Sequence, residues 1–98
     1  MKNYRLSPAS QEDLRKIKAY SLTSWVKRQT QSYLADMKAA LEQLVLSPDL
    51  GKKRDDLVVG LRSFQIRQHL IFYRCREELE VVRILHGRMD IPACFKSH

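Results

Sequence analysis

The stretch GLRSFQIRQHLIFYRCREELEVVRILH, residues 60–86, decides the fold of this chain. From Gly60 onward, apolar and polar side chains alternate with a period of two, which is typical of strands that bury one face. Three β-rich runs follow one another, at residues 61–66, 69–75 and 80–86. Their separators, Arg67-Gln68 and a polar segment around Glu77-Glu78, are short, so antiparallel hairpins are the natural connection. The stretch therefore predicts a three-stranded antiparallel sheet.

Centring the turns on these separators fixes the register of the predicted sheet. Phe64 then lies opposite Ile71, Ile71 lies opposite Ile84, and Tyr73 faces Val82. These side chains project from the same side of the sheet and form one apolar face. Such a face has to be covered by another layer of the fold.

The residues upstream predict a short strand and a first helix. A strand is expected within residues 1–6, because Tyr4 and Leu6 alternate with polar Asn3 and Arg5, as in a half-buried strand. Ser7 can cap a helix, and Pro8 suits its first turn because an N–H group is not needed there. One apolar stripe then follows at helical spacing: Leu14, Ile17 and Tyr20.

A polar break at residues 21–24 separates this helix from a second, longer one. The second helix is predicted to begin at Trp25 and to end at Ser47, because Pro48 disfavours a helical conformation in the residue before it. Trp25, Tyr33 and Met37 are interpreted as packing residues of the buried stripe rather than as a binding site. Two consecutive amphipathic helices should fold back on each other and cover the apolar face of the sheet.

The other face of the sheet mixes large apolar groups with arginines. No further element of the chain is expected to cover it, so it predicts a surface for a partner, namely an amphipathic segment with acidic groups for Arg74 and Arg83. Coverage by the C-terminal tail or by self-association is the alternative. The residues of this face are Leu61, Ser63, Gln65, Leu70, Phe72, Arg74, Val81, Arg83 and Leu85.

The predicted architecture is α+β in a single domain that spans residues 1–98. It consists of a strand at 1–6, a helical hairpin at 8–46, an antiparallel sheet at 60–86 and a tail at 87–98 that is expected to be mobile. Turn-forming and charged residues at 47–60 predict a solvated loop before the sheet.

Composition restricts the partners and the compartment. Eighteen Lys and Arg against 11 Asp and Glu give a net charge of +7, which favours anionic partners. Cys75 and Cys94 lack metal-ligand spacing and form no disulfide framework, so a reducing cytoplasm is expected. No stretch approaches the length of an apolar membrane span, and neither membrane insertion nor export is expected.

His69 and His86 fall opposite each other in the predicted register. The pair is compatible with a metal site or with acid–base chemistry, but two ligands alone make a poor zinc site. Hydrogen bonding at the end of the sheet is the favoured role. No metal and no cofactor are therefore predicted.

Four segments resemble one family when they are taken in order. The opening Tyr4-Arg5-Leu6-Ser7-Pro8-Ala9 with Asp13-Leu14, and Ser47-Pro48 with Gly51, resemble the first strand and helix and the later loop of the RelE/ParE toxin superfamily. Gly60-Leu61-Arg62-Ser63-Phe64 with His69-Leu70-Ile71-Phe72-Tyr73-Arg74 resembles the central hairpin of its ParE branch. Val81-Val82-Arg83-Ile84-Leu85-His86-Gly87-Arg88-Met89-Asp90 resembles the ParE terminal strand with its His-x-Arg-x-Asp ending.

The resemblance implies a ParE-like toxin of a type II toxin–antitoxin system, the kind that stabilises plasmids. Such a toxin poisons DNA gyrase by protein–protein binding, without sequence-specific binding of nucleic acid, and a ParD-like antitoxin neutralises it. Whether the chain forms a homodimer or a toxin–antitoxin hetero-oligomer is left open. The expected antitoxin-binding residues are Leu70, Phe72, Arg74, Val81, Arg83 and Leu85, and the expected target-binding residues are Arg62, Arg88 and Asp90.

Two other functions remain open at this stage. One is a RelE-like, ribosome-dependent mRNA endoribonuclease, for which His86, Arg83 and Arg62 would be the catalytic residues. Gly87 stands where some ribonuclease relatives have a tyrosine, which disfavours this function. The other is a non-toxic relative that has kept only antitoxin binding.

Overall fold

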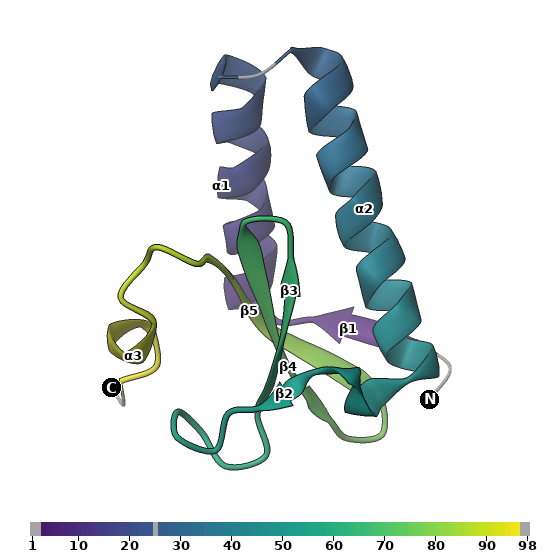
Figure 1. The fold of residues 1–98 in the computed structure, drawn as a ribbon, viewed down its shortest axis with the longest axis vertical. Coiled ribbons are helices and arrows are strands. Elements are labelled where there is room, and N and C mark those ends of the chain that lie inside the picture. Colours follow the sequence, from purple (N-terminus) through teal and green to yellow (C-terminus); the bar gives the residue numbers. More distant parts are fainter. Residues whose placement is uncertain (1–2, 25, 97–98) are drawn as a thin grey trace.

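The computed structural model describes residues 3–24 and 26–96 and confirms the predicted α+β fold (Figure 1). A short strand leads into two long helices, and the remaining strands and a short helix follow. The elements are β1 (Tyr4–Leu6), α1 (Pro8–Ser24), α2 (Lys27–Leu46), a 3-10 turn (Pro48–Leu50), β2 (Lys52–Lys53), β3 (Arg62–Ile66), β4 (His69–Cys75), β5 (Leu79–His86) and α3 (Ile91–Cys94).

The strands form one five-stranded mixed sheet in the order β1-β5-β4-β3-β2. The antiparallel meander from β3 to β5 is the predicted one, and β1 adds to its outer edge in parallel with β5. The prediction of a solvated loop at 47–60 was wrong in part, because Lys52 and Lys53 pair with Ser63 and Arg62 as strand β2. Isolated lysines carry no periodic signal, so a two-residue edge strand escapes sequence analysis.

Helix α1 begins as predicted but ends later. The Ser7 hydroxyl accepts a hydrogen bond from the Ser10 backbone N–H at 3.0 Å, which is the expected cap. The predicted break at 21–24 was wrong, because the Ser21 and Thr23 hydroxyls donate back to Ile17 and Tyr20 carbonyls within the helix. The predicted start of the second helix at Trp25 lies outside the described residues, and α2 is described from Lys27 onward.

The two helices form a hairpin whose closed end projects beyond the sheet (Figure 1). Their shared stripe and one face of the sheet make the main core. Tyr33 and Met37 are buried in it, as predicted, whereas Tyr20 is 65% exposed and does not belong to it. The buried members of this core are Tyr33, Met37, Ala40, Leu41, Leu44, Val45, Ile71, Tyr73, Leu79, Val81 and Ile84.

The register of the sheet matches the prediction except at one point. Phe64 pairs with Ile71 and Ile71 pairs with Ile84, as expected. Tyr73, however, pairs with Val81 rather than Val82, because the register shifts between Phe72 and Tyr73. A bulge of this kind inserts an extra residue and exchanges the faces of the residues beyond it. Val81 therefore belongs to the core under the helices.

Candidate functional site

The reverse face of the sheet is closed by the chain's own C-terminal segment. Phe72 is 0% exposed and Leu85 is 1% exposed, and both pack in a second core with Ile91 of α3. Phe95, which follows α3, meets Phe72 edge to face with ring centroids 4.9 Å apart. The expectation of an uncovered face was therefore wrong, since the tail, which was expected to be mobile, packs on the sheet through Ile91, Cys94 and Phe95. Coverage by the tail, the alternative left open by the sequence, is what the structure has.

Arg83, expected to meet an acidic partner, is already paired within the chain. Its guanidinium donates to both carboxylate oxygens of Asp13 in α1, at 2.8 and 3.0 Å. The hydrogen bond to Asp13 raises the pKa of Arg83. Asp13 also accepts the backbone N–H of Ile84 at 2.9 Å, so it occupies the edge of β5 where a strand partner would otherwise be needed.

Arg74 is paired in the same way on the neighbouring strand. It donates to Glu80 at 2.6 Å, and Arg5 contacts the same carboxylate at 3.4 Å. The hydrogen bond from Arg74 is the largest cause that holds the pKa of Glu80 below its usual range. The acidic groups that the sequence analysis assigned to a partner are thus supplied by the chain itself.

Arg62 holds the loop between α2 and β2. It donates to the Gly51 carbonyl at 2.7 Å and forms an ion pair with Asp49 at 3.7 Å. The buried Tyr73 hydroxyl accepts from the Gly51 N–H at 2.8 Å and donates to the Pro48 carbonyl at 2.7 Å. This loop is therefore tied to the sheet by one arginine and one tyrosine.

The two histidines meet at the other end of the sheet. Their rings lie edge to face with centroids 5.2 Å apart, and the Tyr33 hydroxyl hydrogen-bonds Nδ1 of His69. Burial, and then the neighbouring His86, lower the pKa of His69 to about 4. Hydrogen bonding at the sheet end is thus the role the geometry supports. Within residues 3–24 and 26–96, no group of three or more His, Cys, Asp or Glu side chains is placed to hold a metal ion.

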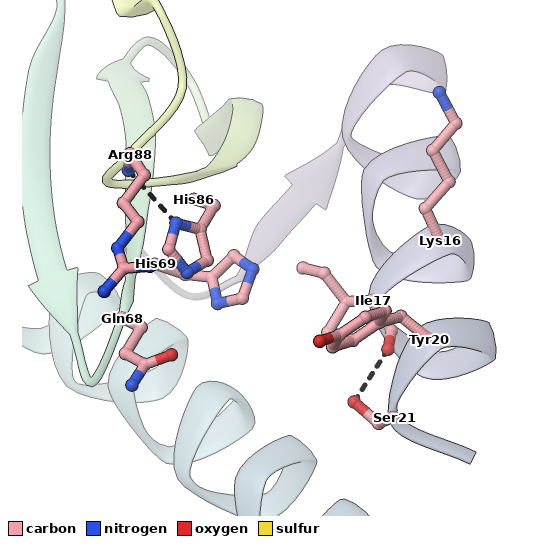
Figure 2. Close-up of a pocket in the computed structure, with 8 residues that line it drawn as sticks. All are labelled: Lys16, Ile17, Tyr20, Ser21, Gln68, His69, His86 and Arg88. Carbon is pink, nitrogen blue, oxygen red and sulfur yellow. Dashed lines mark hydrogen bonds between the residues drawn. The ribbon is translucent and has the colours of Figure 1, made fainter. Parts of the chain in front are cut away.

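A pocket of about 480 Å³ lies between α1 and this end of the sheet. Figure 2 shows the two imidazoles next to each other, facing Ile17 and Tyr20 of α1. The Arg88 backbone N–H donates to Nδ1 of His86 at 3.0 Å. The lining residues are Lys16, Ile17, Tyr20, Ser21, Gln68, His69, His86 and Arg88.

Comparison with known proteins identifies the family. A family described as "ParE toxin of type II toxin-antitoxin system, parDE" matches residues 4–91 of the chain. The chain belongs to the ParE toxin family. "Toxin ParE1" of Caulobacter vibrioides is 33% identical over 93 residues, which cover 95% of this chain and 97% of that protein. "Toxin ParE1" of Mycobacterium tuberculosis is 34% identical over 90 residues, which cover 90% and 92% of the two chains.

The ParE fold is also present in a solved structure described as "Chromosomal ParDE TA system from P. aeruginosa". The superposition has a TM-score of 0.74 and covers 88% of this chain and 96% of the other, at 17% sequence identity. At that identity the likeness concerns the fold alone.

The ParE-family chain does not bring the three residues of the ribonuclease alternative together. His86 pairs with His69 at one end of β4, whereas Arg62 pairs with Tyr73, four positions along the same strand. Four strand positions correspond to roughly 13 Å. Arg62 and Arg83 are moreover engaged with the loop and with Asp13. An acid–base pair aided by cations needs these groups around one phosphate, and they are not so arranged.

The other two residues predicted to bind the target, Arg88 and Asp90, lie on the segment between β5 and α3. Arg88 is exposed, and its side chain borders the pocket. Asp90 caps α3 by accepting the Ala93 N–H at 3.4 Å. In the described part of this ParE-family chain, no helix combines the length and the apolar character needed to cross a membrane.

The role of Asp13 was not predicted from the sequence. Ser10, Asp13, Ile17 and Ser21 recur on one helical face, and the three polar members are 0%, 7% and 1% exposed. Small hydroxyl groups on a buried stripe let a helix approach a strand closely, so an acidic residue among them indicates a buried partner. This pattern, an aspartate between two serines on one helical face, was present in the sequence and indicated a cationic partner on the sheet.

Proposed function

We propose that this ParE-family protein is a toxin that binds and poisons DNA gyrase and is neutralised by a ParD-like antitoxin. It acts in the cytoplasm, through protein–protein contacts rather than through a reaction of its own. The exposed target-binding residues are Arg88 and Asp90, which lie just before the C-terminal helix. Arg62 contributes through the loop that it holds in place.

The separation of His86, Arg83 and Arg62 is the observation that carries this proposal. A ribonuclease on this scaffold would need them around one scissile phosphate. Arg83 is instead held by Asp13, and Arg62 by Gly51 and Asp49. A net charge of +7 favours association with the acidic surface of a nucleoprotein enzyme, which requires no such convergence.

The test is gyrase-driven supercoiling of a relaxed plasmid in the presence of purified protein. Inhibition that increases with concentration is expected, and Arg88→Glu should weaken it because the charge at the contact is reversed. Arg76→Glu is the matched control, since Arg76 is an exposed arginine on the turn at the opposite end of the sheet. Unchanged supercoiling over a broad concentration range, or cleaved mRNA in a translation reaction, would contradict the proposal.

The antitoxin is proposed to occupy the reverse face of the sheet in place of α3. This helix has only four residues, and together with Phe95 it covers Phe72 and Leu85 through few side chains. A longer amphipathic segment would bury more apolar area than α3 does. Its acidic groups would compete for Arg74 and Arg83, and the resulting assembly is a toxin–antitoxin hetero-oligomer. The contact residues on this chain are then Leu70, Phe72, Arg74, Arg83 and Leu85.

A further inference from the structure

The pocket between α1 and the histidine end of the sheet is lined by positively charged and neutral residues. None of the described residues that line it carries a carboxylate, while Lys16 and Arg88 both carry a positive charge. The acidic residue that influences His69 from nearby is Asp13, and its carboxylate is occupied by Arg83 and the Ile84 N–H. The pocket therefore lacks a counter-charge of its own.

The His69 ring is held in place by the Tyr33 hydroxyl, which hydrogen-bonds its Nδ1. The Tyr33 oxygen also accepts a hydrogen bond from the Gln68 backbone. The lowered pKa keeps this imidazole neutral near pH 7.

The tautomer of His86 is fixed by a directed contact. Its Nδ1 accepts the Arg88 backbone N–H at 3.0 Å, which leaves the hydrogen on Nε2 when the ring is neutral. The His86 imidazole thus has an N–H donor left on Nε2. This donor and two cations, without an acid among the described lining residues, favour an anionic group.

The rest of the pocket is apolar. Ile17 and the ring of Tyr20 form the wall on α1, opposite the imidazoles (Figure 2). Tyr20 is 65% exposed, so this wall is open to a partner from outside. A bare inorganic anion would leave the apolar wall wet, whereas an acidic side chain next to an apolar one fills both parts.

We propose that this pocket binds an Asp or Glu side chain, together with an adjacent apolar residue, from a segment of a partner protein. The inference rests on the proposed function in one respect, that a partner protein contacts the chain at Arg88. The carboxylate accepts from the His86 imidazole N–H and from Arg88, with Lys16 at the rim. The apolar neighbour packs on Ile17 and Tyr20.

Peptide titration of the full chain, followed by NMR signals of the histidine rings, tests the proposal. The probes are an acetylated and amidated peptide, alanine-leucine-glutamate-leucine-alanine, and the same peptide with glutamine in place of glutamate. Saturable shifts of the His69 and His86 signals are expected, with affinity about tenfold higher for the glutamate peptide. Equal affinities for the glutamate and glutamine peptides would overturn the proposal. Peptide-induced shifts elsewhere in the protein that leave the His69 and His86 signals unchanged would also overturn it. Inorganic phosphate is the third probe, and shifts as strong as those from the glutamate peptide would reject a protein carboxylate in favour of a phosphate ligand.

Two charge reversals and one matched control locate the site. Lys16→Glu and Arg88→Glu should each weaken the glutamate peptide about fivefold or more, since each adds repulsion at the rim. Lys18→Glu changes an exposed lysine of the same helix that does not line the pocket, and it should leave affinity unchanged. Equal losses of peptide affinity in all three variants would show that the effect depends only on net charge, and this would contradict the proposed site. Gyrase inhibition without peptide binding would refute this inference alone, and peptide binding without gyrase inhibition would refute only the proposed target.

Discussion

Asp13 and Arg83 lie 70 positions apart in the sequence and form a two-point ion pair that joins α1 to β5. Asp13 is 7% exposed, and it also accepts the Ile84 N–H at the edge of the strand. One carboxylate therefore satisfies a cation and a strand edge at once. The position where the first helix docks on the sheet depends on this residue, although the rest of the helical face is made of small or half-buried side chains.

Replacing Asp13 by alanine tests this relationship directly. The free energy of unfolding should fall by about 2 kcal/mol, because a partly buried guanidinium and a backbone N–H lose their acceptor together. Urea unfolding followed by circular dichroism measures the change. Glu12→Ala removes the neighbouring, exposed pair with Arg15 and should leave stability nearly unchanged. Equal stability of the Asp13 variant and the wild type would show that the pair contributes nothing.

Gly51 is a second position where a small change, the addition of one Cβ atom, should affect stability. A Cβ added there would lie 2.7 Å from Cε1 of Tyr73, inside van der Waals contact with a ring that is 0% exposed. Gly51→Ala should therefore destabilise the protein by about 2 kcal/mol, the usual cost of overpacking. Gly87→Ala is the control, since its nearest neighbour, the Gln68 carbonyl, would be at an ordinary 3.6 Å. If the Gly51 variant unfolded at the same urea concentration as the wild type, the predicted clash between the added Cβ and the Tyr73 ring would be wrong.

Protonation of His69 should contribute to the pH dependence of the free energy of unfolding. Its pKa is lowered from 6.5 in the unfolded chain to about 4 in the fold. The unfolded state then binds the proton more tightly, so the stability is fully present above pH 6.5 and is lost as the pH falls towards 4. The loss should be on the order of 2 kcal/mol after allowance for partial exposure of the ring. His69→Gln should flatten the dependence between about pH 7 and about pH 5, where carboxylates contribute little. An unchanged slope in that variant would assign the effect to other groups.

The closure of the reverse face by α3 can be loosened at Phe95. Phe95→Ala should reduce stability by about 2 kcal/mol, less than a fully buried aromatic costs, because Phe95 is half-buried. If a ParD-like segment displaces α3, the same variant should bind the cognate antitoxin more tightly than the wild type, since less has to be displaced. Calorimetric titration of the two proteins measures this. Lys96→Ala, at the exposed next position, serves as the control. Weaker antitoxin binding by the Phe95 variant would mean that α3 is part of the contact instead.

The sequence by itself determined the long elements and most of the register. Alternation of side chains placed Phe64, Ile71 and Ile84 on one face, and the capping serine and Pro48 bounded the helical hairpin. These features depend on residues close together in the sequence and on the fixed periods of helices and strands, so the local sequence predicts them. The candidate arginines and histidines were found for the same reason, as members of recognisable strands.

Only the tertiary structure decided what those residues do. The bulge at Val82, opposite Phe72 and Tyr73, placed Val81 under the helices, and no local sequence pattern predicts a single inserted residue. The tail from Ile91 to Phe95 is too short to show periodicity, yet it buries Phe72, because an apolar face of a sheet takes whatever apolar segment can reach it. Asp13 and Glu80 engaged Arg83 and Arg74 for an equally nonlocal reason, since an ion pair depends on distance in space and not on distance along the chain.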